Sequence, residues 1–201
     1  MPMLEVTDNI GIISFALSGL LISYKERLDI LGLFIIMFLT ALGGGIIRDI
    51  LTDHAPYSFT HYRPTLLVLS VMLIGLLFKL HRRESIERNF WYILSDAIGL
   101  VSFAIAGAIL ALDSGFNLFG VIFVALITAI GGGTLRDMML NKIPFFLRTE
   151  LYGSIALMIG LCIYLLGEWN ILNRWSVSLL FVGSLSLRIV AYYRKWQLPK
   201  I

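Results

Sequence analysis

The sequence predicts an all-α integral membrane protein of seven transmembrane helices, arranged as two inverted three-helix repeats and one extra C-terminal helix. Hydrophobic residues make up 58% of the 201 residues and charged residues 14%, whereas soluble domains have roughly 45–50% apolar and about 25% charged residues. Apolar segments near the roughly 20 residues that cross a bilayer follow one another along the chain. The two halves of the sequence also match at a constant offset, which indicates an internal duplication.

Seven apolar segments are expected to form the membrane helices. In chain order they cover residues 5–22, 28–51, 65–80, 90–112, 116–140, 150–167 and 175–193. The connections between them are short and carry many of the charges, so no segment remains for a soluble domain. We expect the first repeat in residues 1–88, the second repeat in 89–174, and the seventh helix with a cytoplasmic tail in 175–201.

The basic residues predict the orientation of the chain in the membrane. With the N-terminus outside, thirteen of the sixteen lysines and arginines fall on the side of the C-terminus, and only Arg48, Arg63 and Arg174 fall on the other. Cytoplasmic loops carry such an excess. We therefore expect a multi-pass protein of the inner (plasma) membrane with its C-terminus in the cytoplasm. Because these residues flank apolar segments and form no patch, we expect membrane lipids as partners and no nucleic acid.

The duplication appears when the chain is shifted by 88 residues against itself. Asp8, Ile10, Gly11, Ser14, Phe15, Ala16 and Gly19 then fall on Asp96, Ile98, Gly99, Ser102, Phe103, Ala104 and Gly107. Thr40, Ala41, Gly43, Gly44, Gly45, Arg48 and Asp49 fall on Thr128, Ala129, Gly131, Gly132, Gly133, Arg136 and Asp137. Since each repeat holds three helices, the second repeat enters the membrane from the opposite side. Inverted repeats of this kind place a transport site where interrupted helices of both halves meet.

A Gly-Gly-Gly-x-x-Arg-Asp motif occurs in both repeats, at residues 43–49 and 131–137. Three successive glycines weaken a helix interior by roughly 1 kcal/mol each relative to alanine. We therefore expect the second and fifth helices to be broken there, with glycine carbonyls that line a pore or hold a potassium ion. Close packing of the two helices is the alternative, and both can hold. The hydroxyls of Ser14, Ser102, Thr40 and Thr128 either hydrate a permeating ion or bond back to their own helices.

The charged residues of the motif are candidates for selectivity and gating. Neighbours on a helix do not face each other, so the sequence predicts ion pairs between repeats, Arg48 with Asp137 and Arg136 with Asp49. The alternative is that both arginines reach the membrane interfaces. In the channel hypothesis the two aspartates set the preference for cations and offset the arginines. Asp8 and Asp96 are expected to cap the starts of the first and fourth helices.

The sequence contains no recognisable catalytic motif. His54, His61 and His81 are scattered without the spacing of metal ligands, and no motif of a hydrolase, zinc protease or nucleotide-binding enzyme occurs. The single cysteine, Cys162, lies in an apolar segment and is expected to act as a small hydrophobic residue. We therefore expect neither a catalytic residue nor a cofactor.

The doubled glycine motif, the Asp-x-Ile-Gly-x-x-Ser-Phe-Ala starts of helices one and four, and the helix count resemble the bacterial trimeric intracellular cation (TRIC) channel family, also described by a glycine-transporter-type domain. The resemblance covers helices one to six. It implies a homotrimer in which each subunit conducts potassium, and less selectively other monovalent cations, through a pore inside its own six-helix unit. A bound lipid is a separate expectation. The Lys-Glu-Val type sequence that meets a phosphoinositide in animal members is missing here. A carrier for glycine or another small amino acid is the alternative function.

Overall fold

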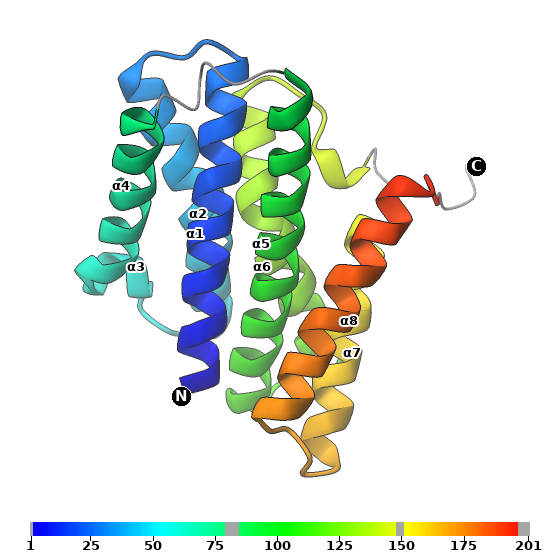
Figure 1. The fold of residues 1–201 in the computed structure, drawn as a ribbon. Helices are drawn as coiled ribbons and strands as arrows, with labels where there is room; N and C mark the ends of the chain where they lie inside the picture. The colour runs from blue at the N-terminus through cyan, green and yellow to red at the C-terminus, as the bar shows by residue number, and fades with distance from the viewer. Residues whose placement is uncertain (1, 79–84, 148–150, 197–201) are drawn as a thin grey trace.

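The computed structural model describes residues 2–78, 85–147 and 151–196, and its regular elements there are all helices (Figure 1). In chain order they are α1 (Pro2–Lys25), α2 (Ile30–Leu51), the single-turn α3 (Tyr57–Thr60), α4 (Tyr62–Leu77), α5 (Ser85–Asp113), α6 (Leu118–Met139), the 3₁₀-helix η2 (Phe145–Leu147), α7 (Tyr152–Glu168) and α8 (Arg174–Tyr193). The all-helical fold class is confirmed. The short elements α3 and η2 were not predicted.

Five described helices are long and apolar enough to cross a membrane, namely α1, α2, α5, α6 and α8. The helices α4 and α7 are also apolar but have only 16 and 17 residues, slightly less than a span perpendicular to a typical bilayer requires. The seven predicted apolar segments thus correspond to these seven helices in order. Five of them meet the length of a full span by themselves.

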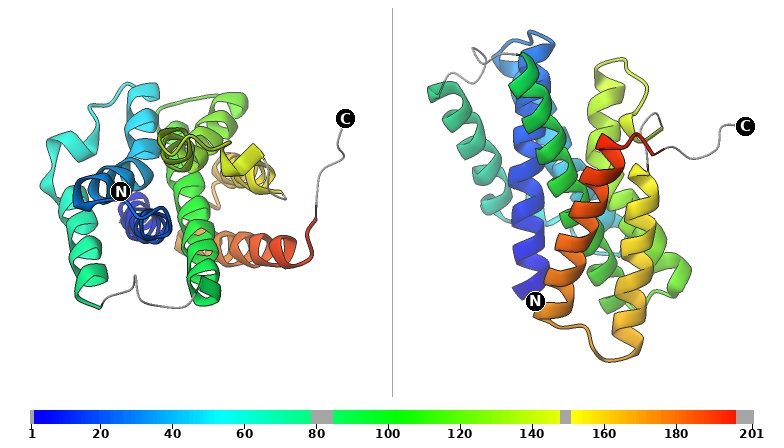
Figure 2. Two further views of the ribbon diagram at one scale, coloured as in Figure 1. Left: turned by 90° about the horizontal axis from the view of Figure 1, so that it is seen from above. Right: turned by 45° about the vertical axis from the view of Figure 1, so that its right-hand side comes forward.

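The centre of the bundle consists of α1, α2, α5 and α6, because α1 packs against α5 and α2 packs against α6. Helix α4 lies against α1 on one side, whereas α7 lies against α5 and α6 on the other. Helix α8 is peripheral and contacts α5 and α7. Seen from above in Figure 2, α4 and α8 accordingly occupy opposite edges of the bundle.

Two hydrophobic clusters form the core, one around α1, α2 and α4 and the other around α5, α6 and α7. Phe103 of α5 belongs to the first cluster, where it makes an edge-to-face contact with Phe15 of α1, with ring centroids 5.3 Å apart. Each ring lies over a glycine of the other helix, since a Cβ at Gly11 would be 2.5 Å from Phe103 Cδ1 and a Cβ at Gly99 would overlap Phe15. Equivalent residues of the two halves thus make reciprocal contacts.

The predicted helix breaks at the triple glycines are not present, because α2 and α6 remain helical through residues 43–45 and 131–133. The glycines instead let two antiparallel helices cross. A Cβ on Gly44 would overlap the carbonyl oxygen of Thr128, and a Cβ on Gly132 would overlap that of Thr40. Small residues permit this close approach of two backbones. Close packing, the alternative considered above, is therefore what the structure shows.

The helix caps also differ from the expectation. Helices α1 and α5 begin at Pro2 and Ser85, so Asp8 and Asp96 lie inside helices rather than at their starts. The observed caps belong to the next helices of each half. Asp29 accepts a hydrogen bond from Gly32 N at 2.7 Å, and Asn117 accepts one from Gly120 N at 2.9 Å. Such caps satisfy backbone N–H groups that have no partner inside the helix.

Candidate functional site

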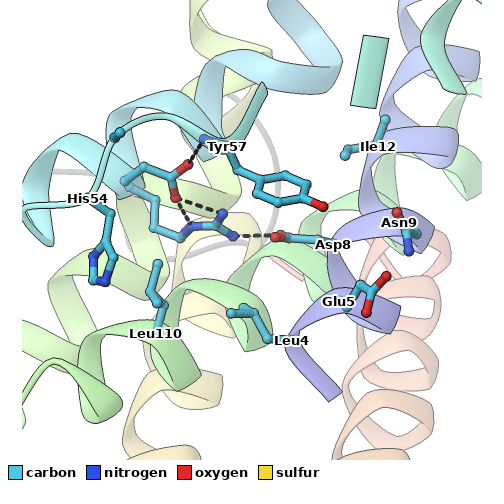
Figure 3. Close-up of a pocket in the computed structure, with 11 residues that line it drawn as sticks. Leu4, Glu5, Asp8, Asn9, Ile12, His54, Tyr57 and Leu110 are labelled. Carbon is cyan, nitrogen blue, oxygen red and sulfur yellow. Dashed lines mark hydrogen bonds and ion pairs between the residues drawn. The ribbon is translucent and has the colours of Figure 1, made fainter. Parts of the chain in front are cut away.

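The first charged cluster lies where α2 ends beside α1. Arg48 Nη1 contacts Asp8 Oδ1 at 2.5 Å, and Arg48 Nε donates to Asp49 Oδ1 at 2.9 Å. The other carboxylate oxygen of Asp49 accepts a hydrogen bond from the backbone N–H of Tyr57 at 2.8 Å. The guanidinium is therefore held between two carboxylates, one of which is fixed by the first residue of α3 (Figure 3).

The second cluster has the same construction 88 residues later. Arg136 Nε donates to Asp137 Oδ1 at 2.8 Å, and Arg136 Nη1 lies 3.3 Å from Asp96 Oδ1. The second oxygen of Asp137 accepts a hydrogen bond from the backbone N–H of Phe145 at 2.7 Å. Because α2 and α6 are antiparallel, their carboxyl ends place the two clusters toward opposite ends of the bundle (Figure 1).

The predicted ion pairs between the halves, Arg48 with Asp137 and Arg136 with Asp49, are wrong. Each arginine pairs with the aspartate next to it and with an aspartate of the same half. The rule that adjacent helical residues face apart fails here because the long arginine side chain turns back. The backbone N–H at the start of the short helix that follows, α3 or η2, orients the aspartate to meet it. The charge of each buried guanidinium is thus balanced locally, without a carboxylate from the other half.

The first cluster lines a cavity of about 320 Å³ (Figure 3). Its walls come from α1, the end of α2, the loop after α2 and α5, through Leu4, Glu5, Asp8, Asn9, Ile12, Arg48, Asp49, His54, Ala55, Tyr57 and Leu110. Besides Arg48, its polar groups include the carboxylates of Glu5, Asp8 and Asp49, the amide of Asn9 and the imidazole of His54. With all carboxyl groups ionised, Asp8, Asp49 and Arg48 together carry one net negative charge, which favours a cation over an anion.

The second cluster is more enclosed. The side chains of Asp96 and Arg136 are 2% and 1% exposed, whereas that of Asp8 is 19% exposed. Ser18 Oγ lies 3.2 Å from Arg136 Nη1, and the Tyr152 hydroxyl donates to Asp96 Oδ2 at 2.7 Å. The Tyr92 ring lies 5.5 Å from the guanidinium carbon of Arg136. Aromatic and hydroxyl groups therefore close this cluster.

Sequence reasoning missed Ser18, Tyr92 and Tyr152. A signal for them existed in the repeat itself. At the offset of 88 residues, Tyr92 falls on Leu4, Tyr152 falls on Pro64 and Ser18 falls on Ala106. The two halves of the repeat differ in polarity at these positions although they share the charged motif. Such a position is a candidate for a residue that makes the two ends of the bundle different.

The predicted hydroxyl residues lie apart from the charged clusters. Thr40 and Thr128 are fully buried and donate to the carbonyl oxygens of Ile36 and Val124 at 2.6 Å, so they bond back to their own helices. Ser14 is half-buried. The hydroxyl of Ser102 is buried and has no hydrogen-bond partner among the described residues. None of the four lines the cavity beside Arg48.

The three glycines of each motif have different neighbours. The first and second glycines face the opposite helix, whereas the third faces the arginine of its own motif. A Cβ at Gly45 would lie 3.9 Å from Arg48 Nη2, and one at Gly133 would lie 3.7 Å from Arg136 Nη2. The motif thus combines a helix crossing with a space beside a buried guanidinium.

The remaining candidate side chains form no metal site in the described part of the chain, where no group of three or more potential ligands occurs. His54 lines the cavity and contacts Thr52, and His61 stacks on Tyr57 with ring centroids 4.0 Å apart. His81 lies outside the described residues. Cys162 is half-buried on α7.

The chain matches the glycine transporter family profile over residues 5–82 and 93–168. It is 36% identical to the UPF0126 membrane protein YvgT of Bacillus subtilis, over 97% of this chain and 95% of the relative. The inner membrane protein YadS of Escherichia coli K12 is 34% identical over 77% of this chain and 74% of its own length. Both relatives are described as membrane proteins.

Solved channel structures share the fold. A prokaryotic TRIC channel crystallised in 0.5 M KCl superposes with a TM-score of 0.89 at 34% identity, over 98% of this chain and all (100%) of that chain. The TRIC orthologue from Rhodobacter sphaeroides gives a TM-score of 0.88 at 27% identity, over 96% and 99% of the two chains. Together with the doubled motif and the helical arrangement, these matches establish that the chain belongs to the TRIC-type glycine transporter family of membrane proteins.

Proposed function

We propose that the chain is a passive channel for monovalent cations, with potassium as the main permeant ion and a pore inside each subunit. The observation that carries the proposal is the pair of charged clusters at opposite ends of the α2–α6 crossing, one of them facing a cavity of about 320 Å³. The structural relatives of this chain are described as TRIC channels or TRIC cation channels, which favours conduction of ions over transport of an amino acid.

The proposed route begins in the cavity beside Asp8 and Asp49, follows the crossing of α2 and α6, and leaves past Asp96 and Asp137. The carboxylates attract cations into this route, and each arginine limits how strongly an ion is retained. Coordination of potassium by the glycine carbonyls, which the motif predicts, requires local opening of the helical hydrogen bonds. Thr40, Thr128, Ser14 and Ser102 would supply hydroxyl ligands in that state.

The assembly and topology are part of the same proposal. Six helices form two inverted repeats, an arrangement supported by reciprocal contacts between equivalent residues of the two halves. We propose a homotrimer, because the relatives are trimeric cation channels by name. The distribution of lysine and arginine favours an N-terminus outside and a C-terminus in the cytoplasm. Membrane lipids contact the exposed apolar side chains of α4 and α8.

Planar-bilayer recording of the purified protein tests this function. Discrete currents in symmetric potassium chloride, with a reversal potential near that of potassium in a gradient, are the expected result. Asp49→Asn removes one carboxylate of the cluster that lines the cavity and should shift the reversal potential toward that of chloride. Asp53→Asn is its matched control, because Asp53 lies outside the cluster on the loop that follows α2. Saturable glycine uptake without unitary current would instead establish the carrier.

A further inference from the structure

Helix α8 carries a buried positive charge although it belongs to neither stretch matched by the family profile. Arg188 is 2% exposed, on a helix whose other large side chains are nearly all exposed or half-buried. Its guanidinium carbon lies 4.8 Å from the centroid of the Tyr152 ring on α7. A cation over an aromatic face is attracted to it, and more strongly where water is excluded. A charge buried in a membrane helix is a candidate for a functional role.

Tyr152 connects this arginine with the second charged cluster. Its ring faces Arg188, and its hydroxyl donates to Asp96 Oδ2 at 2.7 Å. The other oxygen of Asp96 contacts Arg136 Nη1 at 3.3 Å and the hydroxyl of Ser18 at 3.4 Å. A continuous chain of contacts therefore runs from the peripheral helix α8, through α7, to the cluster at the end of α6.

The first cluster differs at this point. The position equivalent to Tyr152 is Pro64, which has no hydroxyl group and no aromatic ring. Asp8, the equivalent of Asp96, has a side chain that is 19% exposed and lines the cavity, whereas the side chain of Asp96 is 2% exposed. Two clusters with the same charges thus differ in enclosure, and Tyr152 occupies the place where they differ.

We propose that Tyr152 and Arg188 are positioning residues that keep the second cluster closed to water and ions, so that α8 controls access to one end of the proposed pore. The inference rests on the proposed channel function for its effect on current. The hydroxyl of Tyr152 satisfies Asp96 Oδ2 without water, and Arg188 holds the ring that carries this hydroxyl. When either contact is lost, Asp96 requires water as a replacement donor, and the cluster hydrates.

Potassium currents through two variants test the proposal. Tyr152→Phe keeps the ring facing Arg188 but removes the hydroxyl, and Arg188→Met removes the cation over the ring. Since a hydrogen bond contributes about 1 kcal/mol, Tyr152→Phe should raise the open probability roughly fivefold. Arg188→Met should raise the open probability less than Tyr152→Phe does. Arg188→Lys, which keeps the positive charge, should have the wild-type open probability. Because the two residues act in series, the double variant should not exceed Tyr152→Phe.

Matched controls use the same substitutions on α8, away from the cluster. Tyr193 is 64% exposed and Arg174 is exposed at the start of α8. Tyr193→Phe and Arg174→Met should leave the open probability unchanged. An equal rise in the controls, or additive effects in the double variant, would contradict a specific connection from Arg188 through Tyr152.

A second measurement does not depend on conduction. Cys162 is the only cysteine, so Ser18→Cys in a Cys162→Ala background places a single thiol in the second cluster. Its reaction rate with a charged methanethiosulfonate reagent should rise about fivefold when Tyr152→Phe is added, and by a smaller factor when Arg188→Met is added. An unchanged rate overturns the inference, whatever the currents show. A raised rate in a protein that passes no potassium current supports the closure by Tyr152 and refutes the channel function alone.

Discussion

Replacement of glycine by alanine is expected to have opposite effects on stability at the α2–α6 crossing and on α8. Gly44→Ala inserts a Cβ where the carbonyl oxygen of Thr128 already lies, and backbone atoms of a packed helix cannot move aside as a flexible side chain can. Gly183 on α8 has no atom within 4 Å of the position that a Cβ would take. The same methyl group therefore meets a packed backbone in α2 and open space in α8.

The magnitudes follow from two opposing effects. Alanine in place of a helical glycine stabilises a helix by about 1 kcal/mol, and Gly183→Ala should show this gain. Overpacking costs about 1–3 kcal/mol, and a contact with backbone lies at the upper end, so Gly44→Ala should be destabilised by about 1–2 kcal/mol net. At roughly 2–4 °C per kcal/mol for a chain of this length, the Tm should rise by about 2–4 °C for Gly183→Ala and fall by about 2–8 °C for Gly44→Ala.

Thermal unfolding of the detergent-solubilised protein, followed by tryptophan fluorescence, measures both shifts. Gly132→Ala is the internal check, because its Cβ would overlap the carbonyl oxygen of Thr40 in the reciprocal contact. It should be destabilised as much as Gly44→Ala. If the Tm values of Gly44→Ala and Gly183→Ala shift in the same direction, the glycines do not serve the crossing and the packing argument fails.

Three further predictions concern the charges, the caps and the cavity. Arg136→Met leaves buried carboxylates without a cation and should destabilise the fold by about 3–5 kcal/mol. Arg48→Met should cost less, because the carboxylates that contact Arg48 face the cavity. Equal losses of Tm in the two variants would contradict this. Asn117→Ala removes a helix cap and should lower the free energy of unfolding by about 1 kcal/mol. An unchanged Tm would show that the cap does not stabilise α6. Leu4→Tyr introduces into the cavity the residue found at the equivalent position of the second half. It should reduce potassium current, whereas Val6→Tyr, at a position 55% exposed, should not; equal currents would contradict the proposed route.

The sequence was sufficient for the fold class and for the approximate ends of the helices. The segment expected at 116–140 is α6 (Leu118–Met139), and that expected at 175–193 is α8 (Arg174–Tyr193). Apolar length determines these elements locally, because every backbone group in a lipid environment needs a partner within its own helix.

The contacts of the site were harder to predict because they depend on tertiary structure. Asp49 turns toward Arg48 since the N–H of Tyr57, eight residues later, holds its other oxygen. The glycines remain helical since Thr128, on another helix, occupies the space beside Gly44. Propensity alone favours a break at three glycines, and packing of the opposite helix outweighs it. The 88-residue offset aligned the two Arg-Asp pairs without identifying the side chains that contact them.

The difference between the two clusters explains how a duplicated chain can have two unlike ends. The duplication retains the groups that hold a buried arginine, namely two aspartates and a backbone N–H at the start of a short helix. These groups balance charge in the same way in both halves, so they cannot by themselves make one end accessible and the other closed. The difference in access comes from the neighbouring residues that differ between the halves. A tyrosine hydroxyl takes the place of water at Asp96, whereas Asp8 faces a cavity. Selection on the neighbours of the motif can therefore change access to each end while the charges that stabilise the crossing stay fixed.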